Sequence, residues 1–297
     1  MVYLDNHLIT LNAQDGTQLN GTYLSNLFFP FKGLLKDDVN ILRSYITVLN
    51  AQIPDSFYVI DNTNNTLLLK RGVNAIQTLT IPVGNYNSST IITALLTTLS
   101  GAEGTDITVS INTVNGILTF YSITTNILYS NANGSTISTI LGFGTSNITI
   151  SASNVSLPYP LNLLGKEKLY INSTNLQNVA YSSVNRGFTS TIAAVPVNVP
   201  PYSLIQYSCA VEQQKCILTN RVLDGIDIQI LDTNSNFINF NNVPWSITLV
   251  LSIEKMDANK FHIQNFDNYL LNEQPVQPEE IMLNPSEKDL DLDFLQS

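Results

Sequence analysis

Residues 41–61, with the sequence ILRSYITVLNAQIPDSFYVID, indicate the fold more clearly than any other stretch of the chain. The side chains of residues 45–50 alternate between two faces, which is the period-two pattern of a β-strand. Pro54 has no backbone N–H to donate, so we expect this strand to end before it. Residues 56–60, SFYVI, are aromatic and β-branched and predict a second strand. A strand of this length that turns at a proline usually crosses a β-sandwich, and we assign it as the first full-length strand of a jelly roll.

Strand-like segments continue on both sides of this stretch. Residues 67–69 are an apolar run behind a polar turn and predict a hairpin that returns along the same sheet. Residues 158–255 contain short alternating segments with turn sequences about every ten residues, the pattern of a sandwich. Upstream, residues 27–31 form an apolar cluster that would either plug the base of the sandwich, which we favour, or dock on a neighbouring molecule.

Residues 72–153 have a different sequence pattern, because a segment with helical spacing of apolar residues appears between predicted strands. Residues 90–99 carry apolar side chains at helical spacing, and either Asn87 or Ser88 would cap this helix. Further on, Asn115-Gly116 lies between two alternating segments, which is a strong hairpin signal. These patterns predict a small α+β unit inserted between sandwich strands.

The whole chain is therefore expected to be mainly β, with a single jelly-roll β-sandwich, a small α+β insertion and an extended acidic C-terminal tail. The expected parts are an N-terminal arm at 1–36, a jelly-roll domain at 37–71 and 154–255, an inserted domain at 72–153, and a linker with the acidic tail at 256–297.

Charge is sparse and unevenly distributed. Charged residues make up 12% of the 297, about half the usual share for a soluble domain, and the net charge is −10. Residues 266–297 hold eight acids and one lysine, so most of the negative charge lies in the tail. No basic stripe is present, which argues against direct nucleic-acid binding. The low charge has two explanations: a surface covered by other subunits, or a Thr/Asn-rich composition without functional meaning.

The last residues alternate acidic and apolar side chains. In the segment 289–295, DLDLDFL, the candidate anchors for a partner protein are Leu290, Leu292, Phe294 and Leu295. Such a segment is either a linear docking motif or a solubilising tail, since its composition favours an extended chain.

The chain has two cysteines, Cys209 and Cys216, which flank a predicted turn. Their spacing fits no metal-binding motif. The two side chains are placed so that a disulfide across two strands is one interpretation, but two half-buried thiols are favoured for a protein made in a reducing compartment.

Catalytic chemistry is poorly supported. His7 and His262 lie near opposite ends of the sequence, and no phosphate-binding loop or nucleophile motif is present. One interpretation of Asp224, Asp227 and Asp232 is a cation site, and the favoured interpretation is a solvated strand edge. We therefore expect no enzyme activity, cofactor or metal site. The apolar runs are also too short to span a membrane.

The segment 51–60, AQIPDSFYVI, resembles the QIPxSFYxI segment near the N-terminus of penton-type minor capsid proteins, which occur in virophages and Polinton-like viruses. Three other regions are similar to the same family in strand pattern and short motifs. They are IPVGNY at 81–86 with ILGF at 140–143, the segments between 163 and 207, and residues 228–251. The resemblance extends over about residues 41–253, and the acidic tail has no counterpart in it.

This resemblance implies a structural virion protein with a single jelly roll, made in the host cytoplasm. Five copies would form a pentamer at each five-fold vertex of an icosahedral capsid whose faces consist of a larger major capsid protein. The insertion would project from one end, and the tail would reach neighbouring major capsid subunits.

Two other functions compete with this one. The first is a receptor- or glycan-binding attachment or spike module, which would need exposed aromatic side chains beside Asp or Asn at one rim; Tyr121, Tyr129 and Phe143 are the candidates in the sequence. The second is a carbohydrate-active enzyme on a jelly roll, which would need two carboxylates facing each other in a cleft. No pair of acids in the sequence stands out for that role.

Overall fold

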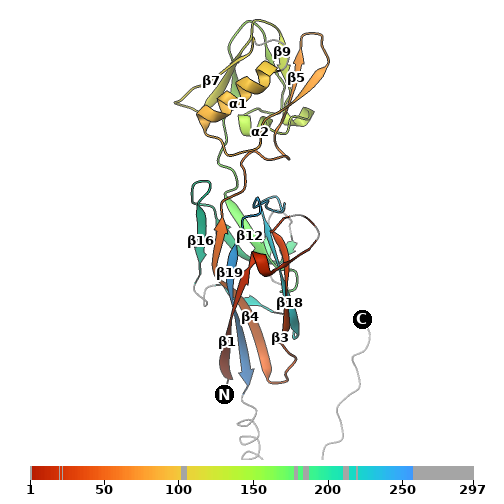
Figure 1. Cartoon of the computed structure of the whole chain (residues 1–297), viewed down its shortest axis with the longest axis vertical. Helices are drawn as coiled ribbons and strands as arrows, with labels where there is room; N and C mark the ends of the chain where they lie inside the picture. Colours follow the sequence, from red (N-terminus) through yellow and green to blue (C-terminus); the bar gives the residue numbers. More distant parts are fainter. Residues whose placement is uncertain are drawn as a thin grey trace, which may run out of the picture.

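Two lobes that lie end to end make up the described part of the chain (Figure 1). The structure is a computed structural model, and it describes residues 2–19, 21, 23–101, 106–176, 180–182, 187–209, 214–218 and 220–256. We call residues 2–54 and 168–256 the jelly-roll lobe and residues 60–163 the inserted lobe. No helix in these described ranges is long and apolar enough to cross a membrane.

The first sheet of the jelly-roll lobe is centred on β4 (Ile41–Pro54) and β19 (Ser246–Met256). Its order is β1 (Val2–Asn12), β19, β4, β16 (Leu204–Ser208), and β17 (Cys216–Ile217) also pairs with β4. Every pairing is antiparallel, and β1 runs along β19 from Val2 opposite Met256 to Asn12 opposite Ser246. The predicted strand around residues 45–50 is therefore confirmed, and it ends at Pro54, one residue beyond the expected end. It is not the first full-length strand of the jelly roll, because the 11-residue β1 precedes it in the same sheet.

The second sheet lies against the first. Its order is β15 (Thr191–Pro196), β12 (Lys168–Asn172), β18 (Leu223–Leu231), β3 (Asn26–Leu35) and β2 (Thr17–Gln18). A separate hairpin pairs β13 (Ala180–Ser182) with β14 (Gly187–Thr189), and a short 3-10 helix, η1 (Ala13–Asp15), follows β1.

The path of the chain between these sheets is that of a jelly roll. The chain passes from β1 in the first sheet to β3 in the second, back to β4, then through β12 and β15 in the second sheet, to β16, to β18 and finally to β19. Each sheet thus interleaves early and late strands, as two Greek keys require. The predicted fold class is confirmed by this order.

A single apolar core fills the space between the two sheets. Trp245 is almost fully buried, packs edge-on against Phe29 with ring centroids 6.0 Å apart, and donates its indole N–H to the carbonyl of Leu24 at 2.7 Å. Because the indole nitrogen finds this acceptor, the largest side chain of the core is buried without an unsatisfied donor.

The predicted N-terminal arm at 1–36 is wrong, because these residues supply β1 and β3 to the two sheets. The apolar cluster at 27–31 belongs to β3, where Leu27 and Phe29 face the core. Sequence reasoning missed the strand because Pro30 and Gly33 interrupt its pattern, and Pro30 lies opposite Gly225 where the pairing with β18 is irregular.

The inserted lobe has its own core, formed by two sheets and a helix. One sheet has the order β10 (Ile148–Ile150), β9 (Asn126–Leu128), β5 (Thr66–Arg71), β6 (Ile76–Thr80), and the other has the order β11 (Val155–Pro160), β8 (Ile117–Tyr121), β7 (Thr108–Ile111). The helices are α1 (Ser88–Gly101), the 3-10 turn η2 (Asn131–Asn133) and α2 (Ser138–Leu141).

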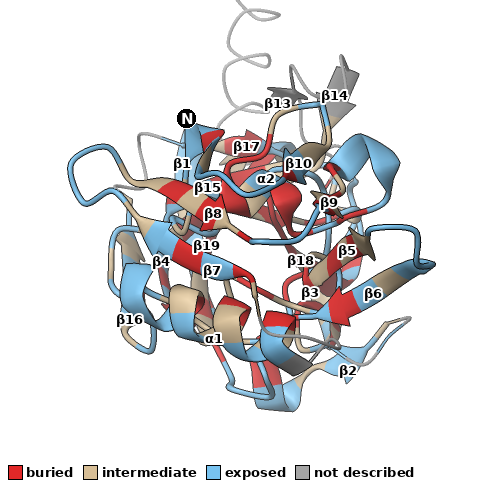
Figure 2. Cartoon of the chain, turned by 90° about the horizontal axis from the view of Figure 1, so that it is seen from above, coloured by how far each residue is buried: buried red, intermediate tan, exposed pale blue. Residues whose placement is uncertain are grey.

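Helix α1 follows the sequence pattern closely. Asn87 caps it, since its Oδ1 accepts the backbone N–H groups of Ser89 and Thr90 at 3.0 and 2.9 Å. The side chains of Ile91, Leu95 and Leu99, spaced four residues apart, are buried. Figure 2 shows buried and exposed residues alternating along α1, as expected for a helix on the surface of a lobe.

Several expected boundaries of the insertion are wrong. Residues 66–71 form β5, which pairs with β6 and β9 of the inserted lobe and not with the jelly roll. Residues 155–160 likewise form β11 and pair with β8. The apolar run at 67–69 is compatible with a strand in either lobe, so its hydrophobic period alone did not identify the strands with which it pairs.

The predicted strand at 56–60 is also wrong. This segment bends at Phe57 and Val59, and only Ile60 forms a bridge, to Gly84. Side chains satisfy the backbone in place of a strand: Asn85 accepts the N–H of Val59 at 2.8 Å, and Asn64 donates to the carbonyl of Val59 at 3.0 Å. Hydrogen bonds from Asn side chains compete in this way with sheet formation.

Two connecting segments, 55–59 and 164–167, join the lobes and run side by side (Figure 1). They approach so closely that a Cβ on Gly165 would lie 3.0 Å from Cγ2 of Val59. Gly165 also has a φ of +69°, which a residue with a side chain rarely adopts. The chain thus leaves and re-enters the jelly-roll lobe at one place.

Candidate functional site

The predicted docking residues Leu290, Leu292, Phe294 and Leu295 lie outside the described residues. Their role stays a prediction.

The two cysteines lie on the edge of the first sheet beside β4. Cys216 is buried, with Sγ 3.8 Å from the carbonyl of Ile192, and Cys209 is half-buried. No S–S bond joins them. Burial, reinforced by the neighbouring side chain of Cys209, raises the pKa of Tyr207 to about 12. Tyr207 is therefore neutral at physiological pH.

The three acids considered for a cation do not converge on one point. Asp227 is buried and holds a turn: its carboxylate accepts bonds from the Ser173 hydroxyl at 2.8 Å and from the Asn175 N–H at 2.9 Å. Asp232 caps the loop after β18 and lies 3.5 Å from Nζ of Lys166. The solvated-edge interpretation is wrong for Asp227, and no group of three His, Cys, Asp or Glu residues in the described ranges is arranged to hold a metal.

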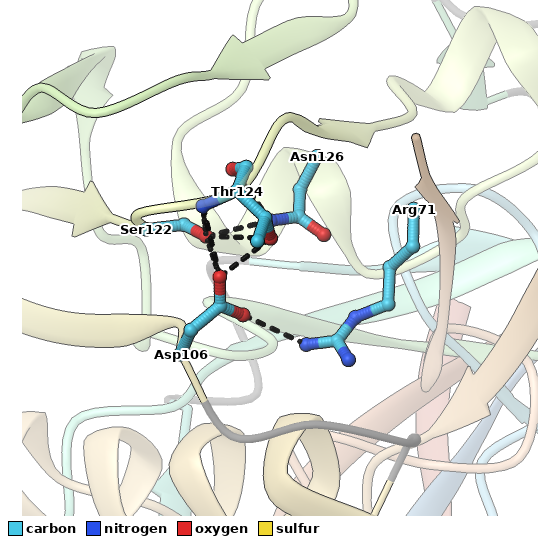
Figure 3. Close-up of polar contacts among 5 residues, drawn as sticks. All are labelled: Arg71, Asp106, Ser122, Thr124 and Asn126. Atoms are coloured by element: carbon cyan, nitrogen blue, oxygen red, sulfur yellow. Dashed lines mark hydrogen bonds and ion pairs between the residues drawn. The ribbon is translucent and has the colours of Figure 1, made fainter. Parts of the chain in front are cut away.

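A polar network in the inserted lobe ties β5 to the turn between β8 and β9 (Figure 3). Nη2 of Arg71 lies 3.0 Å from Oδ1 of Asp106, and both side chains are mostly shielded from solvent. The other oxygen, Oδ2, accepts bonds from the Ser122 hydroxyl at 2.7 Å and the Thr124 N–H at 2.9 Å. Asn126 adds a donor to the Ser122 oxygen at 2.7 Å.

This network keeps the carboxyl of Asp106 ionised. Burial raises the pKa of Asp106, but hydrogen bonds from Thr124 and Ser122 and the charge of Arg71 together outweigh burial, so the pKa lies below its ordinary value. Both carboxylate oxygens of Asp106 are occupied within the network, whereas Oδ1 of Asn126 is buried without a hydrogen-bond partner among the described residues. We interpret the network as a structural support that ties β5 to the turn between β8 and β9.

Asp55 lies where β4 enters the connecting segment and is buried. Its backbone bonds to Tyr202 and Ser203, at 2.8 and 2.9 Å, which fix the end of β4 against the loop before β16. Burial raises the pKa of its carboxyl to about 6. The junction between the lobes therefore contains an acid that titrates near neutral pH.

A cleft lies between the lobes, and we call it the interlobe cleft. Its volume is about 170 Å³. The jelly-roll side and the connecting segments contribute Tyr23, Phe57, Tyr58, Lys166, Phe237, Asn239 and Asn241, and the inserted lobe contributes Asp61, Asn62, Thr63 and Val83.

Sequence reasoning missed this cleft. Tyr23 and Phe237, which are 42% and 41% exposed, are more than 200 positions apart in the sequence, and no motif links them. The aromatic candidates chosen from the sequence do not form a rim of this kind. Phe143 is buried against Phe120 with ring centroids 6.4 Å apart, while Tyr121 and Tyr129 are half-buried.

A second notable surface is the outer edge of β1. This strand is at the end of its sheet, so its outer backbone groups face away from β19. The first part of the strand exposes Val2, Tyr3, Leu4 and Leu8, and Leu8 is 66% exposed. A long edge strand with exposed apolar side chains is a surface on which another chain can pair.

Comparison with known proteins gives similarity at the level of structure. No family model matches the chain, and no curated protein matches it. Among solved structures, the chain is similar to the mavirus penton protein, determined in selenomethionine-labelled form. The TM-score is 0.45 and the identity 9%, over 85% of this chain and 99% of that chain.

Proposed function

We propose that this chain is a structural virion protein: a penton-type minor capsid protein, without enzyme activity, that forms pentamers at the five-fold vertices of an icosahedral capsid. Its partners are further copies of itself and a major capsid protein. Its place is the virion, and it binds no nucleic acid directly.

The edge strand β1 is the observation that carries this proposal. Soluble monomers usually protect such an edge with charges, prolines or a covering segment. Here, in the half of the strand that begins at Val2, apolar residues are exposed, and Asp5 and His7 are its only side chains of a charge-bearing type (Asp, Glu, Lys, Arg or His). A surface of this composition suits the mixed polar and apolar contacts between subunits.

The jelly-roll topology and the sequence resemblance at residues 51–60 also support the proposal. A sandwich that repeats one heterologous contact around an axis closes into a ring. The inserted lobe lies at one end of the sandwich, away from the sides that such neighbours would occupy (Figure 1). The sides of the jelly-roll lobe are thus available for contacts around a ring.

The test is the native mass of the purified full-length protein, measured by light scattering after gel filtration. We expect five times the chain mass of 32.8 kDa. Leu8→Asp should lower the association constant of the pentamer by at least about tenfold, since it places a charge in an apolar contact. The matched control, Val114→Asp, alters a valine in the inserted lobe that is 93% exposed, and it should leave the mass unchanged.

Other masses would contradict the proposal. A trimer would favour the attachment or spike module. A monomer that also fails to co-assemble with the major capsid protein would exclude the vertex role.

A further inference from the structure

We propose that the interlobe cleft is a carbohydrate-binding site that takes one neutral pyranose ring. This proposal goes beyond the vertex function and does not depend on it.

The size of the cleft fits one small ring. A cavity of about 150 Å³ in another protein holds benzene, so a cleft of about 170 Å³ has room for a single six-membered ring and little more. The cleft is open to solvent on one side, so the rest of a longer glycan would extend outward. This geometry excludes large cofactors.

Aromatic rings give the cleft an apolar surface. Tyr23 and Phe237 are each about two-fifths exposed, whereas Phe57, which also lines the cleft, is buried and packs edge-on against Phe240 with centroids 6.3 Å apart. Exposed aromatic rings over a rigid apolar floor are typical of binding sites, because they bury a large area with little loss of side-chain freedom. A pyranose ring offers matching apolar faces formed by its C–H groups.

Polar side chains surround these rings, and several still have capacity for hydrogen bonds. Asn239 accepts the N–H of Asn241 through Oδ1 at 2.9 Å, which leaves its amide nitrogen as a donor without a partner in the described ranges. The hydroxyl groups of Tyr23 and Tyr58 and the amide of Asn62 likewise have no partner among the described residues. These groups can exchange hydrogen bonds with the hydroxyls at the edge of a sugar ring.

The charge of the cleft favours a neutral ligand. Lys166 is paired with Asp232, and Asp61 accepts bonds from the N–H and hydroxyl of Thr63 at 2.8 and 2.6 Å. The lining therefore has one basic and one acidic side chain. The base is already in an ion pair, and the acid already accepts hydrogen bonds. An anionic sugar would gain no unpaired cation here.

The loop that carries Asn239 and Phe237 is held in place before any ligand binds. Asn241 and Asn242 both have left-handed backbone conformations, with φ of 50° and 61°. The side chain of Asn241 donates to the carbonyl of Ser56 at 2.5 Å, and Ser56 donates to the carbonyl of Phe240 at 2.6 Å. Unusual backbone conformations that the surroundings hold fixed often occur at binding sites.

The experiment is saturation-transfer NMR with the full-length protein and a panel of methyl glycosides. The panel contains glucose, galactose, mannose, fucose, N-acetylglucosamine and N-acetylgalactosamine, each at millimolar concentration. We expect transfer to the ring protons of at least one of them. Tyr23→Ala and Phe237→Ala should each raise its Kd by about fivefold or more, as the loss of an aromatic contact implies.

A matched control distinguishes sugar binding in the cleft from nonspecific binding to exposed aromatic side chains. Tyr159→Ala removes an exposed tyrosine that is not part of the lining, and it should leave the Kd unchanged. Circular dichroism and the native mass of each variant confirm folding and assembly, so loss of sugar binding and loss of the pentamer are separate results. Absence of transfer to every glycoside, or equal binding by wild type and both cleft variants, overturns the proposal.

Discussion

The jelly-roll lobe is assembled from distant parts of the sequence, whereas the inserted lobe is assembled from neighbouring parts. In the jelly roll, β1 pairs with β19 from the other end of the described chain. In the inserted lobe, β5 pairs with β6 and β7 pairs with β8 through short turns. Local pairing needs little chain closure, so such a lobe can form early, while the jelly roll must bring its ends together. The comparison predicts that the jelly-roll lobe and the inserted lobe fold and unfold as separate units.

The largest effect should come from the core of the jelly roll. Trp245→Ala removes a buried ring, its contact with Phe29 and its bond to Leu24, and should lower the free energy of unfolding of this lobe by about 3–5 kcal/mol. Hydrogen exchange should accelerate in β4 and β19 and change much less in β5 and β8.

The converse variant sharpens this test. Phe120→Ala removes the buried ring that packs on Phe143 in the inserted lobe, and it should accelerate exchange there while sparing β19. If either substitution destabilises both lobes equally, the chain is one cooperative unit and the division into two units is wrong.

A smaller effect should come from the network in Figure 3. Asp106→Asn leaves Arg71 without its ion pair and should destabilise the inserted lobe by about 2–3 kcal/mol in urea unfolding at pH 7. Since the pKa of Asp106 is lowered in the folded state, this contribution is present above the ordinary value of 3.8 and is lost as the pH falls below it. Asp224→Asn, at an exposed acid, is the control and should have no such effect.

The smallest effect concerns the junction. The pKa of Asp55 rises from 3.8 to about 6 on folding, so between these values the folded state binds more protons than the unfolded state. Stability should therefore fall by about 1–2 kcal/mol as the pH rises from about 4 to about 6, and then level off. Asp55→Asn should abolish this slope in urea titrations across that range. A slope that persists in the variant would assign the pH dependence to another group.

The two lobes also differ in how well their sequences predicted them. Helix α1, its cap at Asn87 and the turn at Asn115-Gly116 depend on residues close in sequence, and all three are confirmed. The long strand β4 and the jelly-roll class followed from period and turn spacing. The pairing of β5 with β9 joins residues more than 50 positions apart, and the period of β5 could not reveal it.

The site was harder to predict for the same reason. The interlobe cleft is formed by side chains from loops of both lobes, such as Tyr23, Asn62 and Phe237. Loop residues carry no periodic signal, and the cleft exists only after both lobes have folded and the connecting segments have placed them. The signal that was available, a polar Asn-rich loop around Phe237, is common throughout this sequence.

The closeness of Val59 and Gly165 has a practical consequence for engineering. Because the two connecting segments run side by side, the inserted lobe has adjacent attachment points. A foreign domain whose own termini are close could therefore replace the inserted lobe without stretching the sandwich. Such a hybrid would carry the foreign domain at the position now occupied by the inserted lobe.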